Sequence, residues 1–418
     1  MTAPGSEEAP SAGARPRRHR RLAVLAAVVL AVLAATGILR QCSEDVVEHA
    51  TIGTFYELPD PLPARAPGSL IRSERLLGAP DGAIAWRVLY HSTDLDGHDI
   101  GVSGIVMAPD RPAPAGGWPI VSWAHPTTGA TGRCAPSEGL DPFALVAGSH
   151  ELLRAGYVIA ATDYSGMGAA GPPSYLIGQT EGNNVLDAAR AARHLDNAHA
   201  GHDLFLWGHS QGGQAALFAA QQAPAYAPEL RLRGVAAAAP AAELGRLLAD
   251  HRDDASGVTI GSYAFDAIGQ VYGPADPQVQ LDTLLTPVGV SVVPKIAARC
   301  LLTDTKALHR IARPAVGDFF AVDPSTTSPW REILEQNTPG HQPIGVPILV
   351  TQGEADKLVI PATTTDFVTR LCGAGEHVTY HRYAHIDHGL AGERSVPLLM
   401  RWLDDTSAEH PPATTCAR

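Results

Sequence analysis

The chain has 418 residues, 45% of them hydrophobic, which is enough for one large core or two smaller ones. Residues 1–40 contain six arginines and two acids, so residues 41–418 hold 25 basic against 41 acidic residues. Such an acidic body excludes nucleic acid as an expected partner. The 41 glycines and 34 prolines are dispersed, which excludes a disordered or collagen-like body.

The N-terminus combines a basic stretch with an apolar one. Five arginines between Arg15 and Arg21 precede Leu22–Leu39, which is 18 residues long and carries no charge. That length is at the lower limit for a membrane-spanning helix and exceeds the usual signal-peptide apolar region of about 7 to 15 residues. Since cationic flanks stay in the cytoplasm, we expect the chain beyond Arg40 to lie outside. The prediction is a single-pass anchor in the cytoplasmic membrane; the alternative is secretion after signal cleavage.

The next segments predict a linker and then a folded core. Residues 40–78 are proline-rich and lack a hydrophobic period, which indicates an extended linker. Residues 85–110 alternate apolar and polar side chains around Asp96 and Gly97, as a β-hairpin does. From Trp118 onward, short apolar runs are separated mostly by helical periods; the runs are residues 119–125, 157–164, 204–210, 233–240 and 346–353. We therefore predict an α/β fold, with a mostly parallel sheet flanked by helices.

The alternation stops after Pro240 and resumes near Val346. The intervening segment is too long for an ordinary loop, and residues 241–251 and 296–312 have helical periods. We expect a helical cap inserted into the fold. The predicted order is a basic cytoplasmic segment, a membrane helix, a linker, the first part of the core, the cap and the second part of the core (residues 1–21, 22–39, 40–78, 79–240, 241–346 and 347–418).

A Gly-x-Ser-x-Gly motif lies within LFLWGHSQGGQAALF, residues 204–218. The motif alone is weak, but here a strand-like run enters it and a helical run leaves it. In the nucleophile elbow of α/β-hydrolases, glycines such as Gly208 and Gly212 prevent a collision between strand and helix, and the serine projects from a strained turn. The following helix N-terminus offers N–H groups to a developing oxyanion. We interpret Ser210 as a nucleophile rather than a residue of a plain turn.

A serine nucleophile needs a base that is oriented by an acid, and in this fold the order is serine, acid, histidine. The apolar run 346–353 is followed by Glu354 and Asp356. We choose Asp356 because it lies further into the loop, with Glu354 as the alternative. Among the later histidines we choose His388, because it lies beyond the next predicted strand, whereas His381 is expected within that strand.

The oxyanion hole of such a site needs two backbone donors. The first is the N–H of Gln211, and the second comes from the loop after residues 119–125. Pro126 has no N–H, so the second donor is Thr127 or Thr128, and the sequence leaves both open. The chemistry requires no cofactor, and none of the five cysteines has the Cys-x-x-Cys spacing of a zinc site, so we expect no metal.

Together these motifs resemble the secretory lipases of the α/β-hydrolase superfamily, which include fungal lipase A-type enzymes and actinobacterial relatives. The resemblance covers nearly everything after residue 54, through FYELPDPLPARAPGSLIRSE, WAHPTTG, RCAPS, AATDYSGMG, WGHSQGGQAALF, QGEAD and IDHG. It implies a triad of Ser210, Asp356 and His388, and a cap that carries the acyl-binding pocket and a lid.

The resemblance also bears on the cysteines and on the oxyanion loop. It implies two disulfides that leave Cys42 unpaired, one joining Cys134 to Cys300 and the other joining Cys372 to Cys416. Bacterial relatives commonly have glycine in place of Pro126, so a stiffer loop here could change the rate or the acyl preference.

We therefore expect an extracytoplasmic serine ester hydrolase, specifically a lipase, whose partners are an ester or lipid substrate and the cytoplasmic membrane. Two alternatives stay open. One is acyl transfer to a cell-envelope alcohol, which uses the same triad. The other is a non-catalytic surface binding protein on a hydrolase fold, for which the loss of a triad residue would be the expected sign.

Overall fold

The structure is a computed structural model that describes residues 53–408, 410 and 413–416. The elements below belong to the compact unit Tyr56–Arg418. The predicted cytoplasmic segment, the predicted membrane helix Leu22–Leu39 and Cys42 lie outside the described residues. Across the part of the chain that is described, no helix is both long and apolar enough to span a bilayer.

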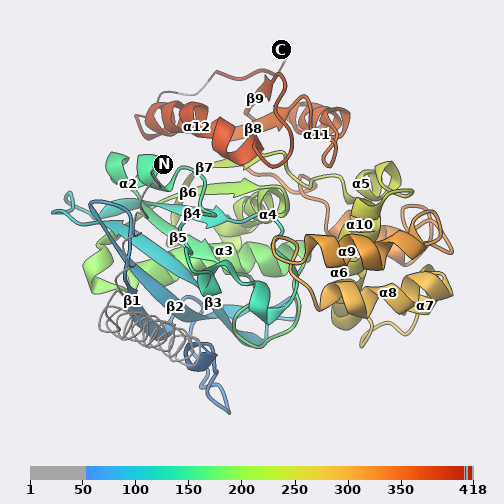
Figure 1. The fold of residues 1–418 in the computed structure, drawn as a ribbon. Coiled ribbons are helices and arrows are strands. Elements are labelled where there is room, and N and C mark those ends of the chain that lie inside the picture. Colours follow the sequence, from blue (N-terminus) through green and yellow to red (C-terminus); the bar gives the residue numbers. More distant parts are fainter. Residues whose placement is uncertain (1–52, 409, 411–412, 417–418) are drawn as a thin grey trace, which may run out of the picture. The chain divides into compact units, whose positions relative to one another are not determined.

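A single sheet organises the described part of the unit (Figure 1). Its strands run in the order β1-β2-β3-β5-β4-β6-β7-β8-β9. Neighbours from β5 through β9 are parallel, while β1, β2, β3 and β5 pair antiparallel in that order. The mostly parallel sheet is thereby confirmed. The strands are β1 Leu70–Leu76, β2 Ala83–Thr93, β3 Asp99–Pro109, β4 Trp118–Ala124, β5 Val158–Thr162, β6 Ala200–His209, β7 Arg231–Ala238, β8 Ile348–Gly353 and β9 Val378–Tyr383.

The hairpin predicted from the sequence is confirmed, whereas the predicted linker is partly a strand. β2 and β3 form the expected hairpin, in which Thr93 pairs with Asp99 and Gly97 has a φ of +81°. The predicted linker 40–78, in contrast, ends in β1, which adds to the sheet edge beside β2. Its sequence LIRSERL carries three charged residues, so it lacks the apolar run by which a strand is recognised.

Helices cover both faces of the sheet (Figure 1). Buried side chains of α3, α4 and α11 pack on one face and those of α2 and α12 on the other. These helices are α2 Ser149–Ala155, α3 Gly178–Arg193, α4 Gln211–Tyr226, α11 Pro361–Gly373 and α12 Ala391–Ser407. Short 3₁₀ turns lie at η1 Gly132–Cys134, η2 Pro136–Glu138, η3 Asp196–Ala198 and η4 Arg313–Ala315.

The chain between β7 and β8 is helical, and its helices lie together at one end of the sheet (Figure 1). They enclose most of an apolar cluster around Tyr263, Phe265, Phe319 and Trp330, which residues 175–177 of the core complete. We call them the inserted helices: α5 Leu244–Asp250, α6 Ala255–Tyr272, α7 Leu281–Leu284, α8 Pro287–Ala297, α9 Thr305–Ala312 and α10 Trp330–Gln336.

The prediction of a helical period over residues 296–312 is too broad, because in the structure the chain is not helical between α8 and α9. Cys300 lies in this break and is bonded to Cys134, and the Leu301 N–H donates to the Thr128 carbonyl (2.7 Å). A disulfide and a backbone hydrogen bond to a distant loop thus hold the break, and neither can be read from local periodicity.

Both disulfides that the family resemblance implies are present. Cys134–Cys300 joins the loop after β4 to the inserted helices, and Cys372–Cys416 joins α11 to the C-terminal segment. Each cross-links segments that are far apart in the sequence, with separations of 166 and 44 residues.

Candidate active site

Ser210 lies on the sharp turn between the end of β6 and the start of α4. Its φ of +58° and ψ of −119° are strained for a residue with a side chain. A Cβ atom at Gly212 would lie 1.9 Å from the Ala124 carbonyl oxygen, and one at Gly208 would lie 2.0 Å from the Gly212 carbonyl oxygen. The two motif glycines are therefore required by close backbone approach, as the elbow interpretation expects.

Three side chains from separate loops form one hydrogen-bonded chain. His388 Nε2 lies 2.9 Å from Ser210 Oγ, and His388 Nδ1 lies 2.8 Å from Asp356 Oδ2. The other Asp356 oxygen accepts the N–H groups of Leu358 (2.8 Å) and Val359 (2.9 Å). The carboxylate is thus fixed from both sides, and it orients the imidazole toward the serine.

The alternatives weighed for these positions lie elsewhere. Glu354 is 3.7 Å from Arg382, its side chain is 45% exposed, and among the described residues no hydrogen bond joins it to His388. His381 belongs to β9, as expected, where its ring contacts that of Tyr383.

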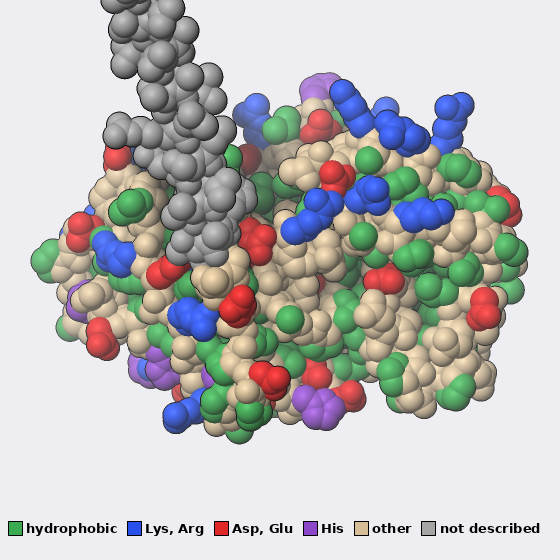
Figure 2. Space-filling model, turned by 60° about the horizontal axis from the view of Figure 1, so that its bottom comes forward, with side chains coloured by type: hydrophobic (Ala, Val, Ile, Leu, Met, Phe, Trp, Pro, Cys, Tyr) green, Lys and Arg blue, Asp and Glu red, His purple; other side chains and the backbone are tan. Residues whose placement is uncertain are grey.

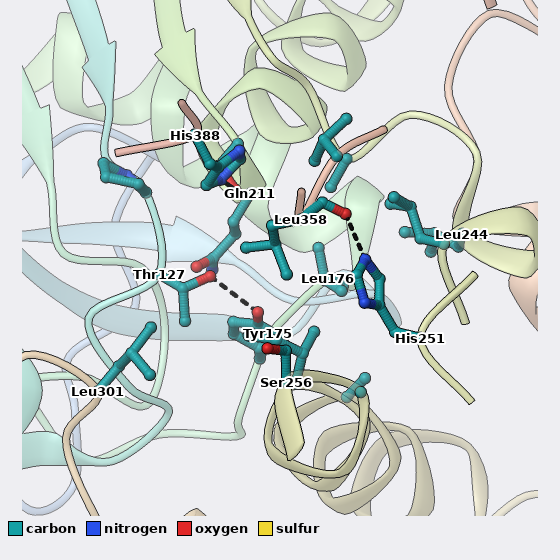
Figure 3. A pocket seen from close by; sticks show the side chains of 18 of the residues that line it. Thr127, Tyr175, Leu176, Gln211, Leu244, His251, Ser256, Leu301, Leu358 and His388 are labelled. Atoms are coloured by element: carbon teal, nitrogen blue, oxygen red, sulfur yellow. Dashed lines mark hydrogen bonds between the residues drawn. The ribbon is translucent and has the colours of Figure 1, made fainter. Parts of the chain in front are cut away.

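The two candidate oxyanion donors face the same cavity (Figure 3). Gln211 and Thr127 both line it, and the Thr127 hydroxyl is 2.8 Å from that of Tyr175. The Thr128 hydroxyl instead donates to the Cys134 carbonyl (2.8 Å), away from the cavity lining. Among the described residues, no hydrogen bond occupies the backbone N–H of Gln211, Thr127 or Thr128, so the choice between the threonines rests on which of them lines the cavity. The geometry therefore favours Thr127 over Thr128 as the second donor.

Glu181 of α3 lies buried behind Gln211, and sequence reasoning missed it. Its Oε1 accepts from the Gln211 amide (2.6 Å) and from the Leu176 N–H (3.1 Å), while Oε2 has no partner among the described residues. Burial raises the pKa of Glu181 to about 8. The carboxyl is therefore mainly protonated at neutral pH. In the sequence, Glu181 is one of the two acids of α3, GQTEGNNVLDAARAAR, and no motif or spacing connects it to Gln211.

Two further residues support the hydrogen-bonded chain. Gln352 donates to Asp356 Oδ2 (3.1 Å) and to the Val359 carbonyl (2.9 Å). The His209 ring lies 4.9 Å from that of His388, and burial lowers the pKa of His209 to about 3. His209 is therefore neutral at physiological pH, and it does not oppose the formation of an imidazolium at His388.

A cavity of about 340 Å³ opens beside Ser210 and His388 (Figure 3). Its wall comes from the core loops and from the inserted helices, and it is mostly aliphatic, with Leu244, Leu247, Leu248, Ile260, Leu301 and Leu334 among its residues. His251 is a polar member of the wall, and its Nε2 is 2.6 Å from the Leu358 carbonyl. Such a lining suits an extended apolar group placed next to the serine. Within the described residues, no His, Cys, Asp and Glu cluster is arranged to hold a metal ion.

Two curated proteins are similar to this chain over most of its length. A protein of Mycobacterium tuberculosis named as a probable inactive lipase is 26% identical over 85% of this chain and 82% of its own. Lipase A of Arthroderma benhamiae is 25% identical over 84% of this chain and 78% of its own.

Among solved structures, Candida antarctica lipase A in its closed state superposes with a TM-score of 0.71 at 20% identity, over 87% of each chain. A rice cell wall degrading esterase of Xanthomonas oryzae gives 0.67 at 22% identity, over 82% of this chain and all of its own. These likenesses show the α/β-hydrolase fold. The family model described as secretory lipase matches residues 145–415, so the chain belongs to the secretory lipase family.

Proposed function

We propose that the chain is an extracytoplasmic serine ester hydrolase that cleaves lipid esters through Ser210, His388 and Asp356. The observation that carries the proposal is the hydrogen-bonded chain from the Asp356 carboxylate through His388 to Ser210 Oγ, at the edge of an aliphatic cavity. Membership of the secretory lipase family supports an ester as the substrate.

The first half of the reaction forms an acyl-enzyme. Ser210 Oγ attacks the ester carbonyl carbon while its proton passes to His388 Nε2, and Asp356 stabilises the imidazolium at Nδ1. The N–H groups of Gln211 and Thr127 stabilise the negative charge on the former carbonyl oxygen. The tetrahedral intermediate then collapses, the C–O bond to the alcohol breaks, and His388 protonates the leaving alcohol.

The second half releases the acid. A water molecule gives a proton to His388 and attacks the acyl carbon, and the bond from that carbon to Ser210 Oγ breaks. His388 returns the proton to Ser210, so the enzyme is restored. The aliphatic cavity would hold the acyl chain during both halves, because its walls exclude water from an apolar chain.

Acyl transfer to a cell-envelope alcohol remains the second catalytic candidate, since an alcohol can replace water in the second half. The non-catalytic alternative draws support from the relative that is named as a probable inactive lipase. In this chain all three side chains are present and connected, which favours catalysis.

We further propose that the catalytic unit acts outside the cytoplasmic membrane, anchored by Leu22–Leu39. Two disulfides suit an oxidising compartment. Mass spectrometry of the N-terminus of the native protein separates an anchored chain from one released by signal cleavage. A membrane fraction that resists alkaline carbonate supports the anchor, and a mature N-terminus beyond residue 39 contradicts it.

The test of the function is a hydrolysis profile over p-nitrophenyl esters of short and long acyl chains. We expect turnover by the wild type and background rates from Ser210→Ala, with Ser256→Ala as a control serine that also lines the cavity. Product analysis with water and alcohol acceptors distinguishes hydrolysis from acyl transfer. Full activity in Ser210→Ala would refute the proposed nucleophile.

A further inference from the structure

The segment from Lys295 to Val316 contains the end of α8, α9 and η4. Its charge balance is positive, whereas that of residues 41–418 as a whole is negative. The segment carries five Lys and Arg residues and one acid, in a protein whose net charge is −12. Figure 2 shows Lys and Arg side chains gathered on the side where Figure 1 places the inserted helices. We call this segment the basic segment; its cations are Lys295, Arg299, Lys306, Arg310 and Arg313.

These cations are available to a partner. All except the half-buried Arg299 are exposed. The one acid of the segment, Asp304, is 2.6 Å from Arg133, a cation from outside the segment. Among the described residues, none of the five segment cations forms a salt bridge. Their charge is therefore not neutralised within the described protein.

The same segment also exposes apolar side chains. Leu302 is 56% exposed and Val316 is 37% exposed, although large aliphatic residues are usually buried. Helix α9 is amphipathic: Leu308 and Ala312 are buried, while the exposed positions include Lys306 and Arg310. An anionic lipid surface attracts the cations and can also accept the exposed aliphatic side chains between its head groups. A soluble polyanion attracts the cations but provides no apolar region for the aliphatic side chains.

The basic segment borders the candidate active-site cavity. Leu301 and Leu302, in the break between α8 and α9, line that cavity, and Leu302 is at the same time exposed to solvent. The disulfide at Cys300 and the hydrogen bond from the Leu301 N–H to the Thr128 carbonyl hold this break against the oxyanion loop. A surface bound by the segment would thus lie next to the cavity entrance.

We propose that the basic segment docks the protein on an anionic phospholipid surface, so that a lipid ester can pass from that surface past Leu302 to Ser210. The passage of the ester rests on the proposed function. The docking does not, because it uses cations that lie outside the cavity lining.

The test compares two charge-matched triple variants of the full chain. Lys295→Gln/Lys306→Gln/Arg310→Gln removes three cations of the segment. Arg65→Gln/Arg394→Gln/Arg401→Gln removes three exposed cations located elsewhere. The binding partners are vesicles of phosphatidylcholine alone and vesicles of phosphatidylcholine and phosphatidylglycerol in equal parts. The N-terminal arginines and Leu22–Leu39 are present in the wild type and in both variants, so their contribution to vesicle binding is the same, and only the differences between these three proteins are interpreted.

We expect the segment variant to bind the anionic vesicles about a hundredfold more weakly than the wild type, or about fivefold per cation. The control variant should lose far less, and raising the salt to about 1 M should abolish the difference because charges are then screened. In hydrogen exchange, anionic vesicles should protect amides of residues 298–316 in the wild type. Hydrolysis of a soluble short-chain ester should be the same in both variants.

Equal binding by the two variants would overturn the proposal, as would an absence of protection over residues 298–316. Stronger binding of the wild type to soluble heparin than to the anionic vesicles would also overturn it, since the partner would then be a soluble polyanion. The Ser210→Ala chain separates the two proposals: it should dock like the wild type, so a failed esterase assay leaves the docking result intact.

Discussion

The buried carboxyl of Glu181 should make the stability of the protein depend on pH through one identifiable group. The neutral form of Glu181 suits its wholly buried site behind Gln211, whereas the ionised form has lost its hydration and gains two hydrogen bonds in return. Glu181→Gln keeps the Oε1 acceptor for both donors and removes the titration. We therefore expect this substitution to stabilise the protein at alkaline pH and to have little effect at acidic pH.

The magnitude follows from the pKa, which burial raises from 4.5 to about 8. A raised pKa means that the folded protein holds a proton that the unfolded chain releases, so stability falls as the pH rises from 4.5 toward 8. At about 1.4 kcal/mol per pH unit, the whole fall is on the order of 5 kcal/mol. About 3 kcal/mol of it is already lost at neutral pH.

The assay is urea unfolding of the wild type and Glu181→Gln between about pH 4 and pH 9, because subtraction of the two curves cancels the other titrating groups. The difference in unfolding free energy should grow from near zero to several kcal/mol in favour of the variant. Asp266→Asn provides a comparison carboxyl of the inserted helices. Burial also raises the pKa of Asp266, but this half-buried group accepts from Gln270, so its difference curve should rise in the same direction and by less. Parallel curves for the wild type and Glu181→Gln would refute the burial of an uncompensated carboxyl at this position.

Two further predictions concern the candidate site. Asp356→Asn should lower kcat by about 10⁴-fold with little change in KM, because the imidazole loses its orienting carboxylate. Glu354→Gln is the control. Equal losses of kcat in the two variants would contradict the assignment of Asp356 as the acid. Replacing Cys134 and Cys300 by serine should lower the unfolding free energy by up to about 5 kcal/mol, because the disulfide closes a loop of 166 residues. The same replacement should lower kcat, because the disulfide holds the break between α8 and α9, where the Leu301 N–H donates to the Thr128 carbonyl. The control replaces Cys372 and Cys416, which are 44 residues apart, by serine. It should lower the unfolding free energy by a similar amount, up to about 4 kcal/mol, and leave kcat unchanged. Equal kcat values for the two double variants would contradict a role of the Cys134–Cys300 bond in positioning Thr128.

The sheet and the elbow were predictable because their signals are local. Apolar runs buried on both faces mark the parallel strands, and the close approach at Gly208 and Gly212 leaves a spacing that can be read in the sequence. The order of Ser210, Asp356 and His388 follows from the fold, since the carboxyl ends of parallel strands meet at one edge of the sheet.

The remaining features depend on contacts between distant segments. The edge strand β1 is charged, and it is held by its pairing with β2. The break between α8 and α9 depends on Cys134 and Thr128, which precede it by more than 150 residues. The partnership of Glu181 with Gln211 joins two helices, and the preference for Thr127 over Thr128 rests on which of them lines the cavity. None of these contacts leaves a periodic or spaced pattern.

Covalent labelling with a fluorophosphonate probe tests the central claim, that Ser210 is an activated nucleophile, most directly. The phosphorus of the probe reacts with a serine only when its Oγ is deprotonated by a neighbouring base, so the reaction is independent of the acyl preference. Peptide mass spectrometry should find one adduct, on Ser210, in the wild type and in Ser256→Ala, and none in folded Ser210→Ala. An unlabelled wild type, or an adduct on another serine, would contradict the claim.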